Sequence, residues 1–486
     1  MFENSKSKRI SSGTVTGLLW SALLAVIMLS VIGCNDENMD EDEMNDMEMN
    51  DTEMNKEENG DTGMDTDKDE TTMFTVTIEN LSGALSLKGS GVFNTPLDAD
   101  DPGPLGPSQS YRFEFYAAEG DRLSLATMFV HSNDLFYATG QDGIALFDDE
   151  GMPRQGDLTK ELSLYNAGTE EDQPLGEGSF QPPSQGTPNT GGDDTDSHVR
   201  VLGAGEQGAP AVDDVIRLEL AYADGRFLGT ITNVSDESTL SLSDGTTTAA
   251  PLAPGVWAVH AEGINPLFVL GASDMGHGLE ALAEDGDPST LAAHLEMLRG
   301  PATPFAPGAW VLHKSDVMPL FTTGVVDPGY GLESLAEDGD PSRLITHLEA
   351  GGMITGAFNM PEGKQEPGPA FPGESFSFTV QARAGDRLSF ATMFGQSNDL
   401  VFAPAASGIP LFDDQGQPMS GDITDQIALW DVGTEVNEYP GVGPNQAPRQ
   451  SAPNTGIEES VGVNLVSDMF FYPAIEKLIR ITITQN

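Results

Sequence analysis

The sequence predicts an all-β protein in which two antiparallel β-sandwiches follow one another in tandem, carry short helical inserts and are preceded by an acidic tether. Three observations support this fold class. Short segments alternate apolar and polar residues with the period of a strand, Gly, Pro and Asp separate these segments, and a long stretch of the chain is repeated. At 486 residues the chain is long enough for two or three domains, each with its own core.

Residues 1–33 are predicted to be a secretion leader that is not part of the fold. Basic residues precede an apolar run from 17 to 32, and "VIGC" ends this run at Cys34. These four residues resemble the lipobox of bacterial lipoproteins, in which the cysteine receives lipid. The alternative is a retained membrane-spanning helix, for which the apolar run is short. Cys34 is the single cysteine of the chain, so no thiol remains for a disulfide, a redox centre or a nucleophile.

Residues 34–72 are predicted to be a disordered tether. They contain dense acidic charge and no aromatic residue, so they cannot bury enough apolar surface to offset the entropy of ordering. A role in export or in collecting calcium is the alternative for this acidic run. The whole chain has 77 Asp and Glu against 22 Lys and Arg, a net charge of -55. Such a chain repels phosphate backbones, which makes nucleic acid a poor partner and divalent cations a better one.

Predicted strands follow the tether along the whole of the remaining chain. The first is "MFTVTIENL", which begins at Met73 and alternates with period two. Six further segments have the same character and are bounded by turn residues: "SYRFEFYAA", "RLSLATMFV", "VIRLELAYA", "RFLGTITNV", "SFSFTVQAR" and "KLIRITITQ". Their β-branched and aromatic residues favour a sandwich over a parallel α/β sheet.

Two layers of internal repeat organise these strands. Residues 107–191 align without a gap with residues 372–456, and about half of the positions are identical. A shorter module, with Trp-x-x-His followed by a helical segment, occurs at 253–298 and again at 306–352. The predicted division is therefore a first sandwich at 73–224, which lacks the module, and a second sandwich at 225–486, which contains it twice.

The module is predicted to form a short helix that packs on a sandwich. Asp287 precedes Pro288, which places an N-capping carboxylate before a proline at the first helical position. Leu291 and Leu295 then fall on one face, and in the second copy Gly351 is expected to end the helix in a left-handed C-cap.

Taken in order, these segments resemble the spondin N-terminal domain family, which includes the spondin domains of F-spondin and mindin and of bacterial spondin-domain lipoproteins. The matching segments are "VWAVH" and "AWVLH", "GLEALAEDGDPS", "DRLSLATMFVHSNDL", "LWDVGTE" and "IEKLIRITIT". The resemblance implies a jelly-roll β-sandwich, calcium bound in its end loops, and a role in adhesion or recognition without catalysis. The thrombospondin repeats and disulfides of the animal proteins have no counterpart here.

The resemblance also implies which residues bind calcium. In the second half they are Asp399, Asp431 and Glu435. In the first half the same positions are Asp134, Asn166 and Glu170, and the amide of Asn166 predicts a weaker first site because it supplies no formal charge.

The spacing of these residues is compatible with a metal site but does not demand one. Asp134 and Asn166 lie 32 positions apart, as do Asp399 and Asp431, which is enough chain to leave one end of a sandwich and return to it. Carboxylates brought together raise one another's pKa unless a hard cation neutralises them. The alternative is that these residues only cap turns, which is the usual role of Asp in loops.

Other clusters have simpler explanations. Asp148 and Asp149, like Asp413 and Asp414, precede a glycine and are most simply hairpin turns. His260 with His294, and His313 with His347, form either metal pairs or packing inherited through the repeat, and the second reading is favoured. Trp257 and Trp310 are expected to be core anchors and not platforms for sugar stacking.

The predicted function is that of a lipid-anchored recognition protein of the bacterial cell envelope. Cys34 provides the link to the lipid bilayer, and Asn35 replaces the Asp associated with inner-membrane retention, so the outer membrane is the expected location. The expected ligand is an extracellular matrix component, a polysaccharide or a protein. No catalytic motif is found, and the alternative function is a surface carbohydrate hydrolase that uses paired carboxylates.

Overall fold

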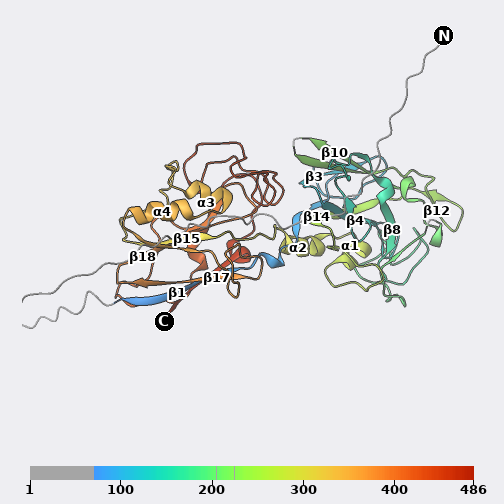
Figure 1. Cartoon of the computed structure of the whole chain (residues 1–486). Coiled ribbons are helices and arrows are strands. Elements are labelled where there is room, and N and C mark those ends of the chain that lie inside the picture. The colour runs from blue at the N-terminus through green and yellow to red at the C-terminus, as the bar shows by residue number, and fades with distance from the viewer. Residues whose placement is uncertain (1–70, 204, 224) are drawn as a thin grey trace, which may run out of the picture. The chain divides into compact units, whose positions relative to one another are not determined.

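The computed structural model describes residues 71–203, 205–223 and 225–486 (Figure 1). The predicted leader, Cys34 and the tether up to residue 70 lie outside these ranges. The described part consists mostly of antiparallel strands with a few short helices, which confirms the all-β prediction. Within these ranges no helix has the length and apolar character needed to cross a membrane.

The first sandwich consists of two antiparallel sheets and two helices. The strands of its large sheet lie in the order β2 (Leu87–Phe93), β14 (Leu252–Ala261), β4 (Asp121–Phe129), β5 (Leu135–Thr139), β8 (Leu162–Asn166) and β9 (Arg200–Val201), and β6 (Ile144–Ala145) pairs with β4. Its small sheet has the order β3 (Ser110–Tyr116), β11 (Arg226–Asn233), β10 (Ile216–Ala223) and β7 (Gly156–Asp157). The helices are α1 (Leu279–Asp285) and α2 (Ser289–Leu298), and a short hairpin joins β12 (Leu240–Ser241) to β13 (Thr247–Thr248).

The second sandwich repeats the large and the small sheet strand for strand, without a counterpart of the β12–β13 hairpin. Its large sheet has the order β16 (Ile354–Phe358), β15 (Gly308–His313), β18 (Arg387–Met393), β19 (Leu400–Pro404), β22 (Ile427–Asp431) and β23 (Asn464–Leu465), and β20 (Ile409–Pro410) pairs with β18. Its small sheet has the order β17 (Ser375–Ala382), β1 (Thr72–Asn80), β24 (Ile479–Gln485) and β21 (Gly421–Asp422). The helices are α3 (Leu332–Asp338), α4 (Ser342–Ala350) and the short α5 (Ile475–Leu478).

Each sandwich has three layers with a core on both sides of the large sheet. In the first sandwich, Phe115 of the small sheet packs against Trp257 of the large sheet, with ring centroids 5.7 Å apart. The opposite face of the same sheet, with Ala258 among its residues, packs against Leu282 and Leu295 of the helices. The strands of the large sheet are therefore buried on both faces, which explains why β4 has an almost continuous run of buried side chains.

The two sandwiches are interleaved along the chain. β1 pairs with β17 over the register Thr72↔Ala382 to Glu79↔Ser375, and with β24 on its other side, so the first strand of the chain is a central strand of the second sandwich (Figure 1). β14 pairs with both β2 and β4, and this brings the first module into the first sandwich. Each sandwich thus contains one copy of the module.

This pairing corrects the division predicted from the sequence. A boundary between residues 224 and 225 would separate β10 from β11, its hairpin partner, and would give both modules to one sandwich. The first sandwich instead spans residues 87–299 and is inserted between β1 and β15 of the second. The order of equivalent strands along the chain differs between the two sandwiches by a circular permutation. β11 and β14 come last in the first sandwich, whereas the equivalent strands of the second sandwich, β1 and β15, come first.

A buried asparagine at the end of one strand shows that β11 and β1 are equivalent. Asn233 Nδ2 donates to the carbonyl oxygens of Leu105 and Ala250, both at 2.9 Å. Asn80 Nδ2 donates in the same way to Thr303 and Ala370, at 2.7 and 2.9 Å. A serine two positions later hydrogen-bonds each asparagine side chain. This polar corner ties the small sheet of each sandwich to two other segments.

The helices of the modules form largely as predicted. Asp287 Oδ1 accepts a hydrogen bond from the first backbone N–H of α2 at 2.9 Å, and Leu291 and Leu295 are fully buried. The predicted C-cap is wrong by one position. Gly351 has a φ of -77° and belongs to the last turn, whereas Gly352, with a φ of +74°, adopts the left-handed conformation.

Candidate functional site

The repeated Ser-Asn-Asp sequence forms the same buried turn at one end of each large sheet. In the first sandwich this turn joins β4 to β5. Ser132 Oγ donates to the carbonyl of Phe129 at 2.6 Å and accepts from the N–H of Leu135 at 3.1 Å, which closes the turn. Asn133 Oδ1 accepts from the N–H of Gln173, and the second sandwich repeats all these contacts. The serine and the asparagine therefore have structural roles.

The aspartates of this turn are buried with one oxygen unpaired. Asp134 and Asp399 are both 0% exposed. Asp399 Oδ2 accepts hydrogen bonds from the N–H groups of Thr434 and Glu435, at 2.7 and 3.1 Å. Asp134 Oδ2 has the equivalent donors, whereas Oδ1 of each aspartate has no hydrogen-bond partner within the described residues. Burial raises the pKa of both carboxyl groups to about 7.

The other predicted calcium ligands of the second sandwich lie in the loop that follows β22, but their oxygens already have partners. Asp431 Oδ1 accepts from the N–H of Gly433 at 2.8 Å, which fixes the tight turn. Glu435 accepts from the N–H of Gly456 at 2.8 Å and from Asn398 Nδ2 at 3.3 Å. The structure thus brings Asp431 and Glu435 into the loop whose backbone donates to Asp399, with the oxygens of both side chains engaged in other hydrogen bonds.

Asn166 and Glu170 have the same positions in the first sandwich. Asn166 Oδ1 accepts from the N–H of Gly168 at 2.7 Å. Glu170 accepts from Asn133 Nδ2 at 2.9 Å and from the N–H of Gly191. As in the second sandwich, the predicted residues meet in one loop region, and only Asp134 retains an unpaired carboxylate oxygen.

A second buried acid in each copy was missed by the sequence reasoning. Glu284 of α1 is 2% exposed and Glu337 of α3 is 3% exposed. Burial, reinforced by nearby acids that include Asp134 and Asp399, raises their pKa values to about 8 and about 7, respectively. The signal was present in the sequence, because "LAED" recurs in both modules. The pattern predicts a helix, but it does not indicate that this helix supplies a side chain to the end loops.

Most of the buried side-chain atoms without a hydrogen-bond partner belong to these loops and helices. In the first sandwich they are Asp134 Oδ1, Thr169 Oγ1, Thr190 Oγ1 and Glu284 Oε2, and in the second they are Asp399 Oδ1 and Thr455 Oγ1. Tyr137 Oη in β5 and Arg299 Nε after α2 are also unpaired. The six atoms of the loops and helices are all oxygens, the ligand type that calcium prefers. Across the described ranges, however, no three Asp, Glu, His or Cys side chains stand at the spacing of a metal cage.

The first site has an acidic cleft beside it. This cleft has a volume of about 340 Å³, and its lining includes Glu284 together with Asp274, Glu280 and Asp285. Asn189 Nδ2 donates to Glu280 at 2.6 Å at its edge. A buried acid that borders an acidic surface cleft has a path along which cations can approach it from solvent.

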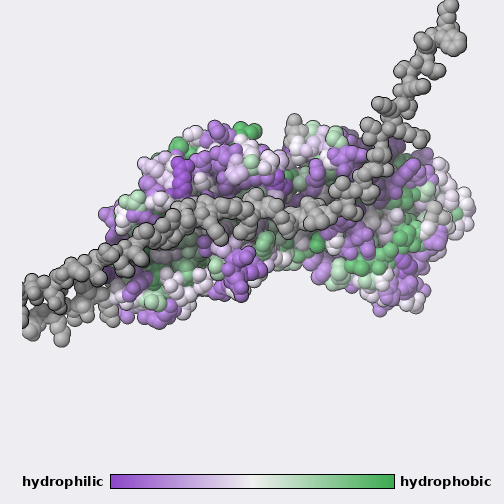
Figure 2. Space-filling model, viewed as in Figure 1, coloured by the Kyte–Doolittle hydropathy of each residue, from purple (hydrophilic) through white to green (hydrophobic). Residues whose placement is uncertain are grey.

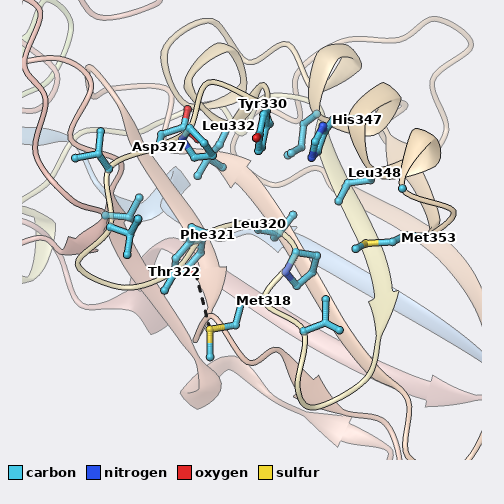
Figure 3. Close-up of a pocket in the computed structure, with 18 residues that line it drawn as sticks. Met318, Leu320, Phe321, Thr322, Asp327, Tyr330, Leu332, His347, Leu348 and Met353 are labelled. Carbon is cyan, nitrogen blue, oxygen red and sulfur yellow. Dashed lines mark hydrogen bonds between the residues drawn. The ribbon is translucent and has the colours of Figure 1, made fainter.

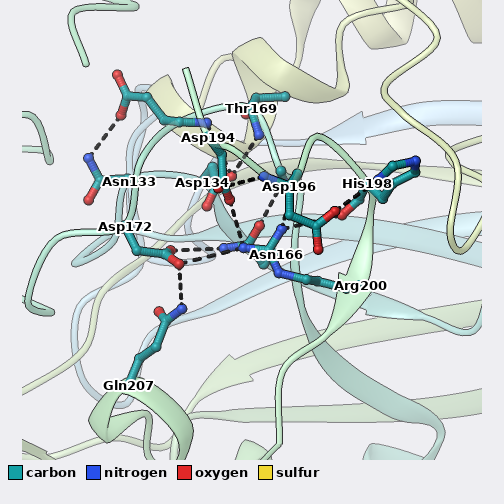
Figure 4. Close-up of polar contacts among 12 residues, drawn as sticks. Asn133, Asp134, Asn166, Thr169, Asp172, Asp194, Asp196, His198, Arg200 and Gln207 are labelled. Carbon is teal, nitrogen blue, oxygen red and sulfur yellow. Dashed lines mark hydrogen bonds and ion pairs between the residues drawn. The ribbon is translucent and has the colours of Figure 1, made fainter. Parts of the chain in front are cut away.

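The first site also contains an arginine (Figure 4). Arg200 in β9 forms an ion pair with Asp194 at 2.7 Å and a longer one with Asp172 at 3.5 Å. Asp172 in turn accepts from Asn166 Nδ2 at 2.9 Å. In the ladder between β8 and β9, Arg200 lies directly opposite Asn166. The guanidinium therefore adds a positive charge to the loops around Asp134.

The remaining candidates have structural roles. Asp148 accepts from the N–H groups of Glu150 and Met152, and Asp413 does the same in the second copy, as expected for turns. His260 is buried and hydrogen-bonds Ser124 Oγ at 2.8 Å, and His313 makes the same bond to Ser389 at 2.9 Å. His294 instead stacks on His277, and His347 stacks on Tyr330. Within each predicted pair the two histidines thus contact different residues, which confirms the interpretation as packing.

The two tryptophans pack as core residues. Trp257 is 8% exposed and stacks on Phe113 with ring centroids 5.8 Å apart. Trp310 is half-buried and stacks on Phe378 at 5.7 Å. Each ring also lies against a glycine of the neighbouring strand, Gly91 or Gly356, where a Cβ would come within 2.9 Å of the indole. These contacts confirm the predicted anchoring role.

An apolar cavity of about 300 Å³ lies elsewhere in the second sandwich (Figure 3). Met318, Phe321 and Leu348 are among its lining residues, and Asp327, Tyr330 and His347 are its ionisable ones. At the position of Gly351, which also lines it, the first module has Leu298, whose side chain packs into the core there. None of the buried acids of the end loops lines this cavity. It is therefore separate from the candidate site.

No model of a known protein family matches the chain, and a search among curated proteins finds no match. The resemblance to the spondin family accordingly stays a prediction based on the sequence segments that carry it.

Proposed function

We propose that this chain is a non-catalytic recognition protein whose end loops are stabilised by calcium, with sandwiches of the spondin jelly-roll type. The observation that carries the proposal is the unpaired Oδ1 of Asp399, on a fully buried carboxylate. A buried carboxylate of this kind requires either a proton or a cation at neutral pH. The same unpaired oxygen occurs at Asp134, so an accident of a single loop explains it poorly.

In the second site, calcium would be held by Asp399, with Glu337, Asp431 and Glu435 as the nearest acids on the same loops and helix. These residues supply only oxygen, and their combined negative charge suits a divalent ion. The bound ion would neutralise acids that otherwise raise one another's pKa. It would thereby fix the loops that follow β18 and β22 relative to α3.

Thermal unfolding of the whole chain tests the calcium proposal. We expect the melting temperature to rise when calcium replaces EGTA, and magnesium to have a smaller effect because it demands a tighter octahedral site. Asp399→Asn should remove the calcium effect, whereas Asp414→Asn, which changes an exposed turn residue, should leave it unchanged. Identical melting curves in calcium and EGTA would show that the buried acids do not bind the ion.

The raised pKa values of Glu284 and Glu337 favour a second candidate, a carbohydrate hydrolase, because general acids often have such values. Burial argues against it, since Asp134 and Asp399 have no surface that a glycoside could contact. Release of reducing sugar from polysaccharides that is lost in Glu337→Gln would establish the hydrolase. Binding to polysaccharide or matrix arrays without any change in the ligand supports recognition.

We place the protein on the bacterial cell envelope, anchored in the lipid bilayer through Cys34 and facing outward from the outer membrane. The sequence around "VIGC" and Asn35 supports this location. Hydrophilic residues predominate on the face seen in Figure 2, as expected for domains that are exposed to water outside the membrane. The ligand would be an extracellular matrix component, a polysaccharide or a protein, and nucleic acid is disfavoured by the net charge of -55.

A further inference from the structure

The apolar cavity of about 300 Å³ in the second sandwich lies between α4 and the loop that joins β15 to α3 (Figure 3). Aliphatic and aromatic side chains line most of it, including Leu320, Leu344 and Met353. Among the described residues, none of the buried side-chain atoms without a hydrogen-bond partner belongs to this lining. A water molecule would therefore find few polar partners inside, and the cavity suits an apolar occupant.

The first module holds the same loop in the same way but places a large side chain in this space. The N–H groups of Gly271 and Gly324 each donate, at 2.8 Å, to the valine that precedes the last strand of their own large sheet. Leu298 packs against the core of the first sandwich, and Gly351 occupies its position in the second module. The loss of this side chain contributes the space for the cavity.

The rim of the cavity differs between the two modules in the same direction. Val325 and Val326 line the cavity and are 53% and 44% exposed. Their counterparts in the first module are Ala272 and Ser273. The Oγ atoms of Ser273 and Ser197 hydrogen-bond each other at 3.2 Å, so this edge of the first sandwich is polar. The second sandwich thus combines an open apolar space with exposed apolar side chains at its edge, as binding sites for apolar molecules do.

The charges of the lining restrict the kind of molecule that can bind. Asp327 is its carboxylate, and within the described residues the lining includes no Lys or Arg. Arg343 acts on the charge of Asp327, but it is exposed and lies outside the lining. A ligand with a carboxylate or a phosphate inside the cavity would be repelled by Asp327 and by the net charge of -55. An uncharged ligand is therefore favoured.

We propose that this cavity binds an uncharged hydrocarbon molecule of about ten carbon atoms, which enters from solvent past the apolar rim. The inference goes beyond the calcium function and does not depend on it. An apolar cavity of about 150 Å³ can hold benzene, so a volume of about 300 Å³ has room for roughly twice as many carbon atoms. Met318 and Met353 line the cavity, and their flexible side chains can adapt to the shape of such a molecule.

Isothermal titration of the whole chain with 1-decanol tests this inference, in EGTA so that calcium has no part in the result. The wild type should bind one molecule per chain. 1-Octanol should bind more weakly, by about fourfold for each CH₂ group that is removed. Sodium decanoate should bind more weakly than 1-decanol by about tenfold, because its carboxylate meets Asp327.

A matched pair of variants shows where the alcohol binds. Gly351→Leu gives the second module the residue of the first and should abolish binding, and its φ of -77° suits leucine. Ala350→Leu adds the same side chain one position earlier, outside the lining, and should leave binding unchanged. Val326→Ser copies the polar rim of the first module and should weaken binding. Far-UV circular dichroism should show that all three variants are folded.

Three results would overturn the inference. These are a wild type that does not bind 1-decanol, binding that survives in Gly351→Leu, and equal affinity of Val326→Ser and the wild type. None of them bears on calcium, which the melting curves of the Asp399→Asn variant test separately.

Discussion

Replacement of Asp399 by Asn should stabilise the metal-free protein at neutral pH. The folded state raises the pKa of Asp399 from 3.8 to about 7, because the carboxyl group is buried. A carboxyl group shifted in this direction favours folding below pH 3.8, and this contribution is lost as the pH rises toward 7. The shift of about three pKa units corresponds to roughly 4 kcal/mol at pH 7.5. Asparagine resembles the protonated acid and avoids this cost.

Hydrogen exchange in increasing urea measures this effect for each sandwich separately. In EGTA at pH 7.5, peptides within 396–436 of Asp399→Asn should show a free energy of opening about 4 kcal/mol higher than in the wild type. At pH 4 the two proteins should be nearly equal. Calcium at 100 times its dissociation constant should stabilise the wild type by about 2.7 kcal/mol and the variant hardly at all.

Peptides within 131–171 serve as an internal control, because they belong to the first sandwich and should not change. Asp414→Asn controls for the loss of one negative charge. A variant that is less stable than the wild type in EGTA at pH 7.5, and that calcium still stabilises, would show that the ionised Asp399 is satisfied by its backbone donors alone. The explanation by an unpaired buried charge would then be refuted.

Three further predictions concern other parts of the molecule. Asn233→Ala and Asn80→Ala should each lower the free energy of unfolding by about 1–3 kcal/mol in urea titrations, because each removes two hydrogen bonds to buried carbonyl groups, which keep one other donor each, and also removes the buried acceptor of a serine hydroxyl. Gly356→Ala should cost about 1–3 kcal/mol and alter tryptophan fluorescence, because its Cβ would come within 2.9 Å of the Trp310 ring. Metabolic labelling with a fatty-acid analogue should mark the wild type and not Cys34→Ala, and equal labelling of the two would contradict the lipid anchor.

The sequence was sufficient to identify the strands because the alternation of apolar and polar residues can be read within each short segment. The segment beginning at Met73 predicted a strand, and β1 spans Thr72–Asn80. Its partner could not be predicted in the same way. The β1 segment "FTVTIEN" and the β11 segment "FLGTITN" share a phenylalanine at their start and an asparagine at their end, so each fits the small sheet of either sandwich. Which strand joins which sheet depends on the length and path of the connections.

The candidate site was predictable to a similar extent. Asp134 and Asp399 could be identified because the repeat marks them and because each directly precedes a buried strand. Glu284 escaped notice because α1 lies 150 positions further along the chain, and only the fold brings this helix to the loop. The exchange of Asn166 and Asp172 for Asp431 and Asn437 was visible in the aligned repeats. Only the structure shows that the amide donates to the carboxylate in both loops, from Asn166 to Asp172 and from Asn437 to Asp431.

The interleaved topology makes a strong prediction about where the chain can be cut. Leu87 and Arg299, the two ends of the inserted first sandwich, form a parallel bridge with each other. Ser86 N donates to the carbonyl of Leu298 at 2.9 Å, and Gly300 N donates to Leu87 at 2.7 Å. Chains so paired lie about 5 Å apart, a gap that one or two glycines can span. Removal of residues 87–299 with such a linker should therefore leave the second sandwich folded.

The excised protein retains β1 between β17 and β24, and Asn80 keeps its acceptors on Thr303 and Ala370. A fragment of residues 225–486, which a simple tandem arrangement would favour, lacks β1 and leaves a gap between two apolar strands of the small sheet. We expect cooperative urea unfolding and dispersed amide resonances from the excised protein, and neither from the fragment. If the fragment folds as cooperatively as the excised protein, β1 is not needed to complete the second sandwich and the interleaved assignment fails. The fragment also carries β11, β14, α1 and α2 without their partner strands. A fragment of residues 300–486 lacks these elements and shares β15 to β24 with the excised protein, so a difference in folding between those two proteins comes from β1 and its asparagine corner.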